Sequence, residues 1–203
     1  MNYNDIKRRG VDCMNNLAFS NNNVDYEILN GEIVYMTPRP VPNHNTVIVN
    51  LSIIFGNYLK GKNCKVFADG VDVYLDEKNN VIPDLMITCN RDIIKSNGVF
   101  GAPDLIVEVL SPSTATNDKG YKKNLYEWFC VKEYWIVDIP SKSIDVYLLQ
   151  NGKYTLDYVY SIFPDYILEK MTDEEKQKVI TKFKTSLFDD LIIDIEDVFY
   201  DIN

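Results

Sequence analysis

Two acidic side chains interrupt apolar stretches that otherwise have the composition of buried strands. Glu108 lies within the run 105–110 (LIVEVL), and Asp84 follows Pro83 at the start of the run 85–87 (LMI). Apolar runs of this kind occupy the middle of a sheet, where an ionised carboxylate is costly unless a cation compensates it. If the two strands are neighbours, both carboxylates meet at one edge of the sheet. Two hard oxygen ligands with open positions suit Mg²⁺ or Mn²⁺.

A helix expected over 117–129 brings further groups to this region. Asp118, Lys122 and Tyr126 recur every four residues and therefore share one side of that helix. Lys122 is the candidate third member of the site. Each carboxylate also has a simpler interpretation, a structural ion pair with a nearby Lys or Arg. For Asp118 and Lys122, the spacing alone favours an ordinary solvated helix pair.

His44, the only histidine, precedes the first long predicted helix. A lone histidine is more often a packing residue than a ligand, although with Glu27 it would flank the cleft. A Ser-His-Asp triad would have to use His44, and the sequence has no G-x-S-x-G, P-loop, G-x-G-x-x-G or H-E-x-x-H motif. A glycosidase-like carboxylate pair is not excluded by residue type, but it would leave Lys122 unexplained.

The composition predicts one globular domain over residues 1–203. The chain is 46% hydrophobic and 25% charged, and a domain of this size buries enough surface to fold without a metal or a disulfide. The net charge of −9 excludes a wholly basic nucleic-acid-binding domain and leaves room for a local cationic strip. The candidates for phosphate contacts are Arg39, Lys60, Lys62, Lys119, Lys122 and Lys123.

Cellular location is predicted from cysteines and apolar runs. Cys13, Cys64, Cys89 and Cys130 show no close pairing, which favours free thiols in a reducing compartment over a disulfide scaffold or a zinc site. The first ten residues lack an apolar signal-peptide core, and no apolar run approaches the ~20 residues of a membrane span. We therefore expect a cytoplasmic protein without a membrane segment.

The elements that must position these groups follow from hydrophobic periodicity and turn signals. Asn30-Gly31 between two β-prone runs predicts a hairpin, and Thr172-Asp173-Glu174-Glu175 is a capping box that predicts a helix over 172–183. The other predicted elements are a helix over 45–60, a strand over 71–76, an apolar run over 81–89, strands over 105–110, 134–137 and 144–149, and a strand near 154. This order is typical of an α/β or α+β fold with a mixed sheet.

Several sequence motifs, taken in their order along the chain, resemble those of a known family. They are Tyr26 to Val34, His44, Pro83-Asp84-Leu85, Pro103 to Thr114, Asp118, Lys122, Tyr126 and Glu133 to Asp138. Together they resemble the Uma2 family of restriction-endonuclease-like proteins, assigned to the PD-(D/E)XK superfamily. The resemblance covers 24–160, after an N-terminal segment over 1–23. The remainder, 161–203, is a C-terminal extension with the capped helix as an insertion.

The resemblance implies a fold and a site. The superfamily core is α-β-β-β-α-β around a mixed sheet flanked by helices, which the predicted elements from 45 to 137 match. Asp84 and Glu108 would be the acidic metal ligands. The superfamily's lysine two residues after the second acid is Leu110 here, so the amine would come from the next helix as Lys122, with Lys119 and Lys123 nearby.

The role of a second acid on the same strand stays open. Asp104 lies four residues before Glu108 and shares its face of the strand, as a group behind the ligands or as an alternative ligand.

Three functional hypotheses follow. The first is a Mg²⁺- or Mn²⁺-dependent endonuclease that hydrolyses DNA. The second is a catalytically inactive nuclease-fold protein with a binding or regulatory role, and the third is an acidic interaction protein without an ion site. A homodimer would supply the two sites that two cuts in a duplex require, and no residue of the sequence demonstrates one.

Overall fold

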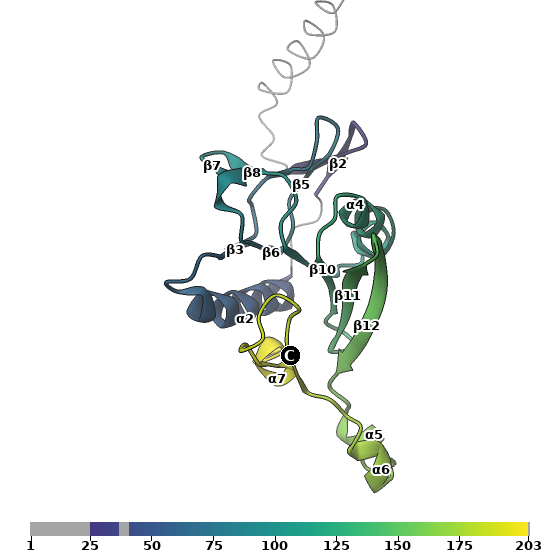
Figure 1. Cartoon of the computed structure of the whole chain (residues 1–203). Coiled ribbons are helices and arrows are strands. Elements are labelled where there is room, and N and C mark those ends of the chain that lie inside the picture. Colours follow the sequence, from purple (N-terminus) through teal and green to yellow (C-terminus); the bar gives the residue numbers. More distant parts are fainter. Residues whose placement is uncertain (1–24, 37–40, 203) are drawn as a thin grey trace, which may run out of the picture.

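The computed structural model describes residues 25–36 and 41–202, which form two six-stranded β-sheets, called here the first and the second sheet, and a further sheet of two strands, with helices around them (Figure 1). The predicted segment 1–23, Cys13 and Arg39 lie outside the described residues. The predicted hairpin is present as β1 (Tyr26–Leu29) and β2 (Glu32–Tyr35). Asn30 and Gly31 both have positive φ angles, 53° and 83°, as the tight two-residue turn requires.

The first sheet combines this hairpin with short strands from the middle of the chain. Its spatial order is β2, β1, β5 (Asn80–Val81), β4 (Val73–Tyr74), β8 (Gly98–Phe100) and β7 (Ile94–Lys95). Only β4 and β8 pair in parallel. A 3-10 turn η1 (Arg91–Ile93) precedes β7. Of the strand predicted over 71–76, the structure forms Val73–Tyr74 alone.

The second sheet contains the longer strands and the two acids of interest. Its spatial order is β12 (Lys153–Ser161), β11 (Ser143–Gln150), β10 (Glu133–Asp138), β9 (Leu105–Val109), β6 (Leu85–Thr88) and β3 (Lys65–Ala68). β9 and β10 pair in parallel, and the other neighbours are antiparallel. The sheet is therefore mixed, as the sequence predicts.

Helices cover both faces of the second sheet. α2 (Pro42–Leu59) begins with a proline in its first turn, where the missing N–H costs nothing, and it packs on one face through Val47, Leu51 and Phe55. The segment after β9 consists of α3 (Ala115–Asn117), a π-helical turn η2 (Asp118–Lys122) and α4 (Lys123–Trp128). Leu125 and Tyr126 pack on the other face, in a core that the first sheet closes.

Seen along the chain, α2, β3, β6, β9, α4 and β10 give the order α-β-β-β-α-β. This is the core that the resemblance implied, with the strands of the first sheet inserted around it. Within residues 25–36 and 41–202, no helix is long and apolar enough to cross a membrane.

The C-terminal part differs from its prediction. Two short helices follow β12, α5 (Asp165–Leu168) and α6 (Asp173–Lys176). The capping box on Thr172 is present, but α6 ends at Lys176. The predicted start of the helix is therefore confirmed, and its predicted extension to residue 183 is wrong. Phe183 belongs instead to β13 (Lys182–Phe183), which pairs with β14 (Ile193–Asp194), because its ring stacks on Tyr160 and contacts Trp135 in the core.

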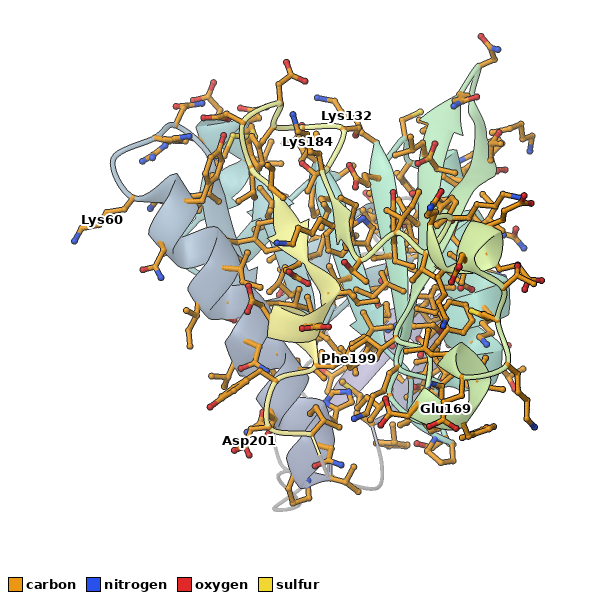
Figure 2. The ribbon with its side chains drawn as sticks, turned by 90° about the horizontal axis from the view of Figure 1, so that it is seen from below. Lys60, Lys132, Glu169, Lys184, Phe199 and Asp201 are labelled. Atoms are coloured by element: carbon orange, nitrogen blue, oxygen red, sulfur yellow. A yellow bond between two sulfur atoms is a disulfide. The ribbon has the colours of Figure 1, made fainter. Side chains whose placement is uncertain are left out.

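The end of the chain returns to α2. α7 (Ile195–Val198) lies beside α2 in both views, and Phe199 lies at this contact (Figure 2). The Asn50 side-chain amide donates to the carbonyls of Val198 and Tyr200 at 3.1 and 2.9 Å. The extension therefore completes the α2 side of the core.

The prediction of free cysteines is wrong for two of the four. Cys64 and Cys89 form a disulfide, and they stand immediately beyond the Lys65–Thr88 pair of β3 and β6. Antiparallel register brings residues 25 positions apart into direct opposition, a proximity that sequence spacing does not show. Cys130 is free and exposed.

Candidate active site

Asp84 and Glu108 face one another across two neighbouring strands. β6 and β9 pair with Leu85 opposite Val107, so the next positions in register are Asp84 and Glu108. Side chains directly opposite in an antiparallel pair have Cβ atoms about 4.5–5.5 Å apart. The Asp84 side chain also binds the end of β9, because its Oδ2 accepts a hydrogen bond from the Val109 N–H at 2.7 Å.

Glu108 is held by two groups from the following helix. Its Oε1 accepts hydrogen bonds from Lys122 Nζ at 3.0 Å and from the Tyr126 hydroxyl at 2.7 Å. The side chain is 3% exposed. Burial raises the pKa of Glu108 well above its ordinary value, and the Lys122 charge acts against that shift.

Lys122 is surrounded by acids rather than by solvent. Its Nζ lies 2.7 Å from Glu27 Oε1, 3.0 Å from Glu108 Oε1 and 3.7 Å from Asp118 Oδ1, and the residue is 4% exposed. Burial acts to lower the pKa of Lys122, and the charges of the three acids raise it by more. The solvated Asp118–Lys122 pair that spacing favours is therefore wrong, because a helix packed on a sheet buries the whole stripe.

The helix that carries these groups is not a regular α-helix at this point. Asp118 to Lys122 form the π turn η2, a form that occurs mostly as single turns and often at functional sites. Asp118 is 1% exposed, and its backbone carbonyl accepts a hydrogen bond from the Tyr134 hydroxyl at 3.0 Å. Burial raises the pKa of Asp118, against the effect of Lys122.

His44 reaches Asp84 from the first turn of α2. Its Nε2 lies 3.3 Å from Asp84 Oδ2, and the residue is buried. Burial alone would lower the pKa of His44, but the hydrogen bond and charge of Asp84, together with the Val109 carbonyl, raise it overall. His44 thus orients the Asp84 carboxylate that Val109 also holds.

Asp69 is an acid at this edge that the sequence reasoning missed. β3 pairs with β6 with Ala68 opposite Leu85, so Asp69 stands opposite Asp84, and its N–H donates to the Asp84 carbonyl at 2.9 Å. Burial first and the Asp84 charge second raise the pKa of Asp69. Asp69, Asp84 and Glu108 therefore form one row across three strands. The sequence signal that could have identified Asp69 is the turn-forming pair Asp69-Gly70, which ends the run 65–68. That run was not predicted as a strand.

Asp104 is not part of this group. Its carboxylate accepts hydrogen bonds from the Cys89 N–H at 2.7 Å and from Lys132 Nζ at 2.7 Å, at the opposite end of β9 from Glu108. The residues share a side of the strand, but four residues of strand separate them by about 13 Å. The structure gives Asp104 a structural role at the far end of the sheet.

The two facing carboxylates fit a divalent cation in their donor chemistry. Each commits one oxygen to the contacts above, and within residues 25–36 and 41–202 neither Asp84 Oδ1 nor Glu108 Oε2 has a hydrogen-bond partner. No group of three or more His, Cys, Asp and Glu side chains in the same residues is arranged to hold a metal. Mg²⁺ is commonly bound by one or two carboxylates, with waters and substrate phosphate completing its shell. The residues therefore fit Mg²⁺ or Mn²⁺.

The comparison with protein families decides the family. Residues 12–168 match the model of Uma2, described as "Putative restriction endonuclease". The chain belongs to the Uma2 family. The match spans the hairpin, both sheets and every residue of the candidate site, from Glu27 to Tyr126.

Two relatives in sequence and one solved structure are similar to this Uma2 chain. Two uncharacterised proteins of Synechocystis sp. are 34% and 28% identical to it over 124 and 116 residues, and the matches span 60% and 55% of this chain and 65% of each relative's length. A crystal structure from Anabaena variabilis, described as a "putative nuclease belonging to DUF820", superposes with a TM-score of 0.66 at 18% identity. It covers 90% of this chain and 94% of that one. The restriction-endonuclease-like fold is thereby confirmed.

Proposed function

We propose that this Uma2 protein is a divalent-metal-dependent endonuclease that hydrolyses DNA phosphodiester bonds. The observation that carries the proposal is the placement of Asp84 opposite Glu108, with Lys122 Nζ 3.0 Å from Glu108 Oε1. This supports the assignment of the PD-(D/E)XK acids to Asp84 and Glu108 and of the amine to Lys122.

Asp84 and Glu108 would hold one or two Mg²⁺ or Mn²⁺ ions through their uncommitted oxygens. A bound ion of this kind neutralises charge on the scissile phosphate and lowers the pKa of a coordinated water. The chain's own residues prepare the ligands for it. Lys122 and Tyr126 fix the position of the Glu108 carboxyl group, and the Lys122 charge acts against the burial that raises its pKa. His44 and the Val109 N–H orient Asp84.

Lys122 has a further role in this proposal, the electrostatic one. An ammonium beside the two ligands stabilises the charge that develops on the pentavalent phosphate or orients the attacking water. Lys119 is exposed, and Lys123 Nζ lies 3.8 Å above the Tyr147 ring, so the structure separates both from Glu108 and favours Lys122 among the three.

A second candidate function is supported by the same lysine. Lys122 is buried and contacts three acids, as a purely structural cation would, and this favours a nuclease-fold protein that binds but does not cleave. The cytoplasmic location, the homodimer and the division into 1–23, 24–160 and 161–203 stay predictions.

The proposal is tested by cleavage and metal binding in parallel. Plasmid and single-stranded DNA are incubated with Mn²⁺ or Mg²⁺ and wild-type protein, Asp84→Asn or Glu108→Gln. We expect both substitutions to abolish cleavage and the rise in melting temperature that Mn²⁺ gives the wild type. Asp104→Asn is the matched control, because it changes an acid at the other end of β9 and keeps an acceptor for the Cys89 N–H. Cleavage that survives both site substitutions contradicts the proposed site, and absence of both cleavage and the Mn²⁺ shift in wild type favours the second candidate.

A further inference from the structure

The outward side of α2 carries no charged side chain. The helix has 18 residues and contains no Asp, Glu, Lys or Arg, although these residues make up 25% of the chain. Contact with the core explains their absence from the inner side only, because the solvent side of a surface helix is ordinarily charged or polar. The exposed positions of α2 after its first proline are Asn45, Val49, Ile53 and Asn57. Depletion of charge is also characteristic of the centre of protein–protein interfaces.

The middle of this outward side is apolar. Val49 and Ile53 are one helical turn apart and are 50% and 55% exposed. The C-terminal segment adds Tyr200, which is 71% exposed and whose carbonyl accepts a hydrogen bond from the Asn50 side chain at 2.9 Å. At Gly56 an added Cβ would meet no atom within 4 Å, so a second helix can approach closely there. We define the α2 face as Asn45, Val49, Ile53, Gly56, Asn57 and Tyr200.

The exposed positions of α2 are symmetric about the level of Leu51 along the helix. When two copies of α2 lie antiparallel and cross at this level, Val49 stands opposite the partner's Ile53. Asn45 then stands opposite the partner's Asn57. Apolar side chains therefore meet apolar ones, and amides meet amides. A surface that matches itself under a two-fold rotation is what an isologous dimer requires.

The charges around the α2 face differ in sign between its two ends. Figure 2 shows Lys60 at the C-terminal end of α2 and Asp201 beside the half of the helix nearer its N-terminus. At the C-terminal end, basic groups outnumber acids: Lys60, Lys62, Lys65 and Arg91 against Asp92 and Asp190. Along the other side, α7 and the segment after it present Glu196, Asp197 and Asp201, whereas Asp194 is paired with Lys182 at 3.3 Å. An antiparallel second copy brings the basic end of each face to the acidic end of the other.

We propose that the α2 face is the interface of a homodimer in which two α2 helices pack antiparallel about a two-fold axis at the level of Leu51. Lys60 of each copy then approaches the partner's Asp201. Nucleic acid does not fit this face, because phosphates require cations at the centre of the contact. A contact strip about 27 Å long and about 20 Å wide buries roughly 1,000 Å² from the two copies together, the lower limit of a specific interface. We therefore expect a reversible dimer.

The interface would also fix the separation of the two candidate sites. His44, which contacts Asp84, belongs to the first turn of α2. In the antiparallel arrangement the two first turns lie at opposite ends of the contact, and the two sites lie apart from one another. The proposal goes beyond the proposed function and does not depend on it.

Sedimentation velocity of the full-length protein over a dilution series measures the dissociation constant of the dimer. Ile53→Asp places a carboxylate opposite the partner's Val49, and we expect the constant to rise by at least about 30-fold, the effect of losing one central anchor. Ile33→Asp is the matched control, because Ile33 is an exposed isoleucine on β2 and should leave the constant unchanged. Thermal unfolding by circular dichroism separates loss of the dimer from loss of the fold.

A charge exchange tests the antiparallel arrangement without disturbing the apolar centre. Lys60→Glu and Asp201→Lys each place like charges together in both symmetry-related contacts. Each should weaken the dimer about 2- to 30-fold, the range for two exposed ion pairs. The double variant restores opposite charges, and its dissociation constant should return to within about twofold of wild type.

Three results overturn the inference. They are a wild type that stays monomeric over the whole dilution series, a dimer that Ile53→Asp leaves intact, and a double charge variant that associates as weakly as either single variant. The result is separable from the proposed function, because association is measured without DNA or metal. A Glu108→Gln protein that cleaves nothing should dimerise as the wild type does.

Discussion

Lys122 Nζ lies closer to Glu27 Oε1, at 2.7 Å, than to Glu108 Oε1, at 3.0 Å. Glu27 belongs to β1 of the first sheet and Glu108 to β9 of the second, so one ammonium joins the two sheets at the candidate site. Glu27 Oε1 also accepts a hydrogen bond from the Ile82 N–H at 2.9 Å. The N-terminal hairpin is thereby fixed to the site rather than merely adjacent to it.

Lys122→Met should destabilise the protein strongly. The substitution keeps the packing volume but leaves Glu27, Glu108 and Asp118 buried without their cation, and breaking a buried pair in this way costs about 3–5 kcal/mol. The free energy of unfolding, measured with urea at neutral pH, gives the loss. Lys119→Met on the exposed side of the same helix should stay within about 0.5 kcal/mol, and equal losses for the two variants would contradict the buried network.

Glu27→Gln should cost less than Lys122→Met. The amide oxygen still accepts from the Ile82 N–H, and Glu108 and Asp118 still compensate Lys122, so only one charge-assisted hydrogen bond is lost, at about 1.5–3 kcal/mol. Urea unfolding measures this loss, with the exposed Glu32→Gln on the neighbouring strand β2 as the control. A Glu27→Gln protein as stable as the control would mean that the two sheets are held together without this contact.

Glu133 makes a pH-dependent contribution to stability. Its Oε1 accepts from Trp135 Nε1 at 2.7 Å, and its Oε2 accepts from the Ser186 N–H and hydroxyl at 2.7 and 2.6 Å. Burial raises the pKa of Glu133 above the ordinary 4.5, and these hydrogen bonds act against the shift. Between 4.5 and the raised pKa the folded state binds more protons than the unfolded state, so this contribution falls as pH rises through the window.

The comparison of wild type with Glu133→Gln isolates that contribution. The difference in unfolding free energy, wild type minus variant, should be larger below pH 4.5 than at neutral pH, and urea unfolding across a pH series measures it. A difference that grows as pH rises would show that the hydrogen bonds outweigh burial and lower the pKa.

Loss of the Cys64–Cys89 disulfide should destabilise the edge of the second sheet. The bond joins residues 25 positions apart, and closing a loop of that length is worth about 3–4 kcal/mol in the chain-entropy account. Cys64→Ser should lower the free energy of unfolding by this amount, whereas Cys130→Ser, at an exposed free thiol, should not. Peptide mapping without reductant checks the pairing itself, and a Cys64 peptide found unlinked would contradict it.

Local signals made much of the fold predictable. The Asn30-Gly31 turn defines its own hairpin, the periodicity of Val47, Leu51 and Phe55 defines α2, and an acid within an apolar strand points to Glu108. Each of these depends on residues near one another in sequence.

The missed features depend on residues that meet only after folding. The strands β7 and β8 of the first sheet are two and three residues long and carry too little pattern for periodicity to show. The register of β3 with β6 places Asp69 opposite Asp84 and Cys64 opposite Cys89, and the sequence alone does not show that register. The inserted helix starts as predicted, because its capping box is formed by residues close in sequence, but it is shorter than predicted, because the ring of Phe183 is buried against Tyr160.

The π turn at Asp118 to Lys122 limits how this region tolerates changes in length. In a regular helix each residue advances the direction of the side chains by about 100°, so deleting Gly120 would rotate everything before the cut relative to everything after it. Asp118 would then turn relative to Lys122, Leu125 and Tyr126, which all follow the cut. A point substitution at Gly120 should disturb little, because an added Cβ there meets no atom within 4 Å. Deleting Gly120 would instead shift Asp118 relative to the part of the helix that packs in the core.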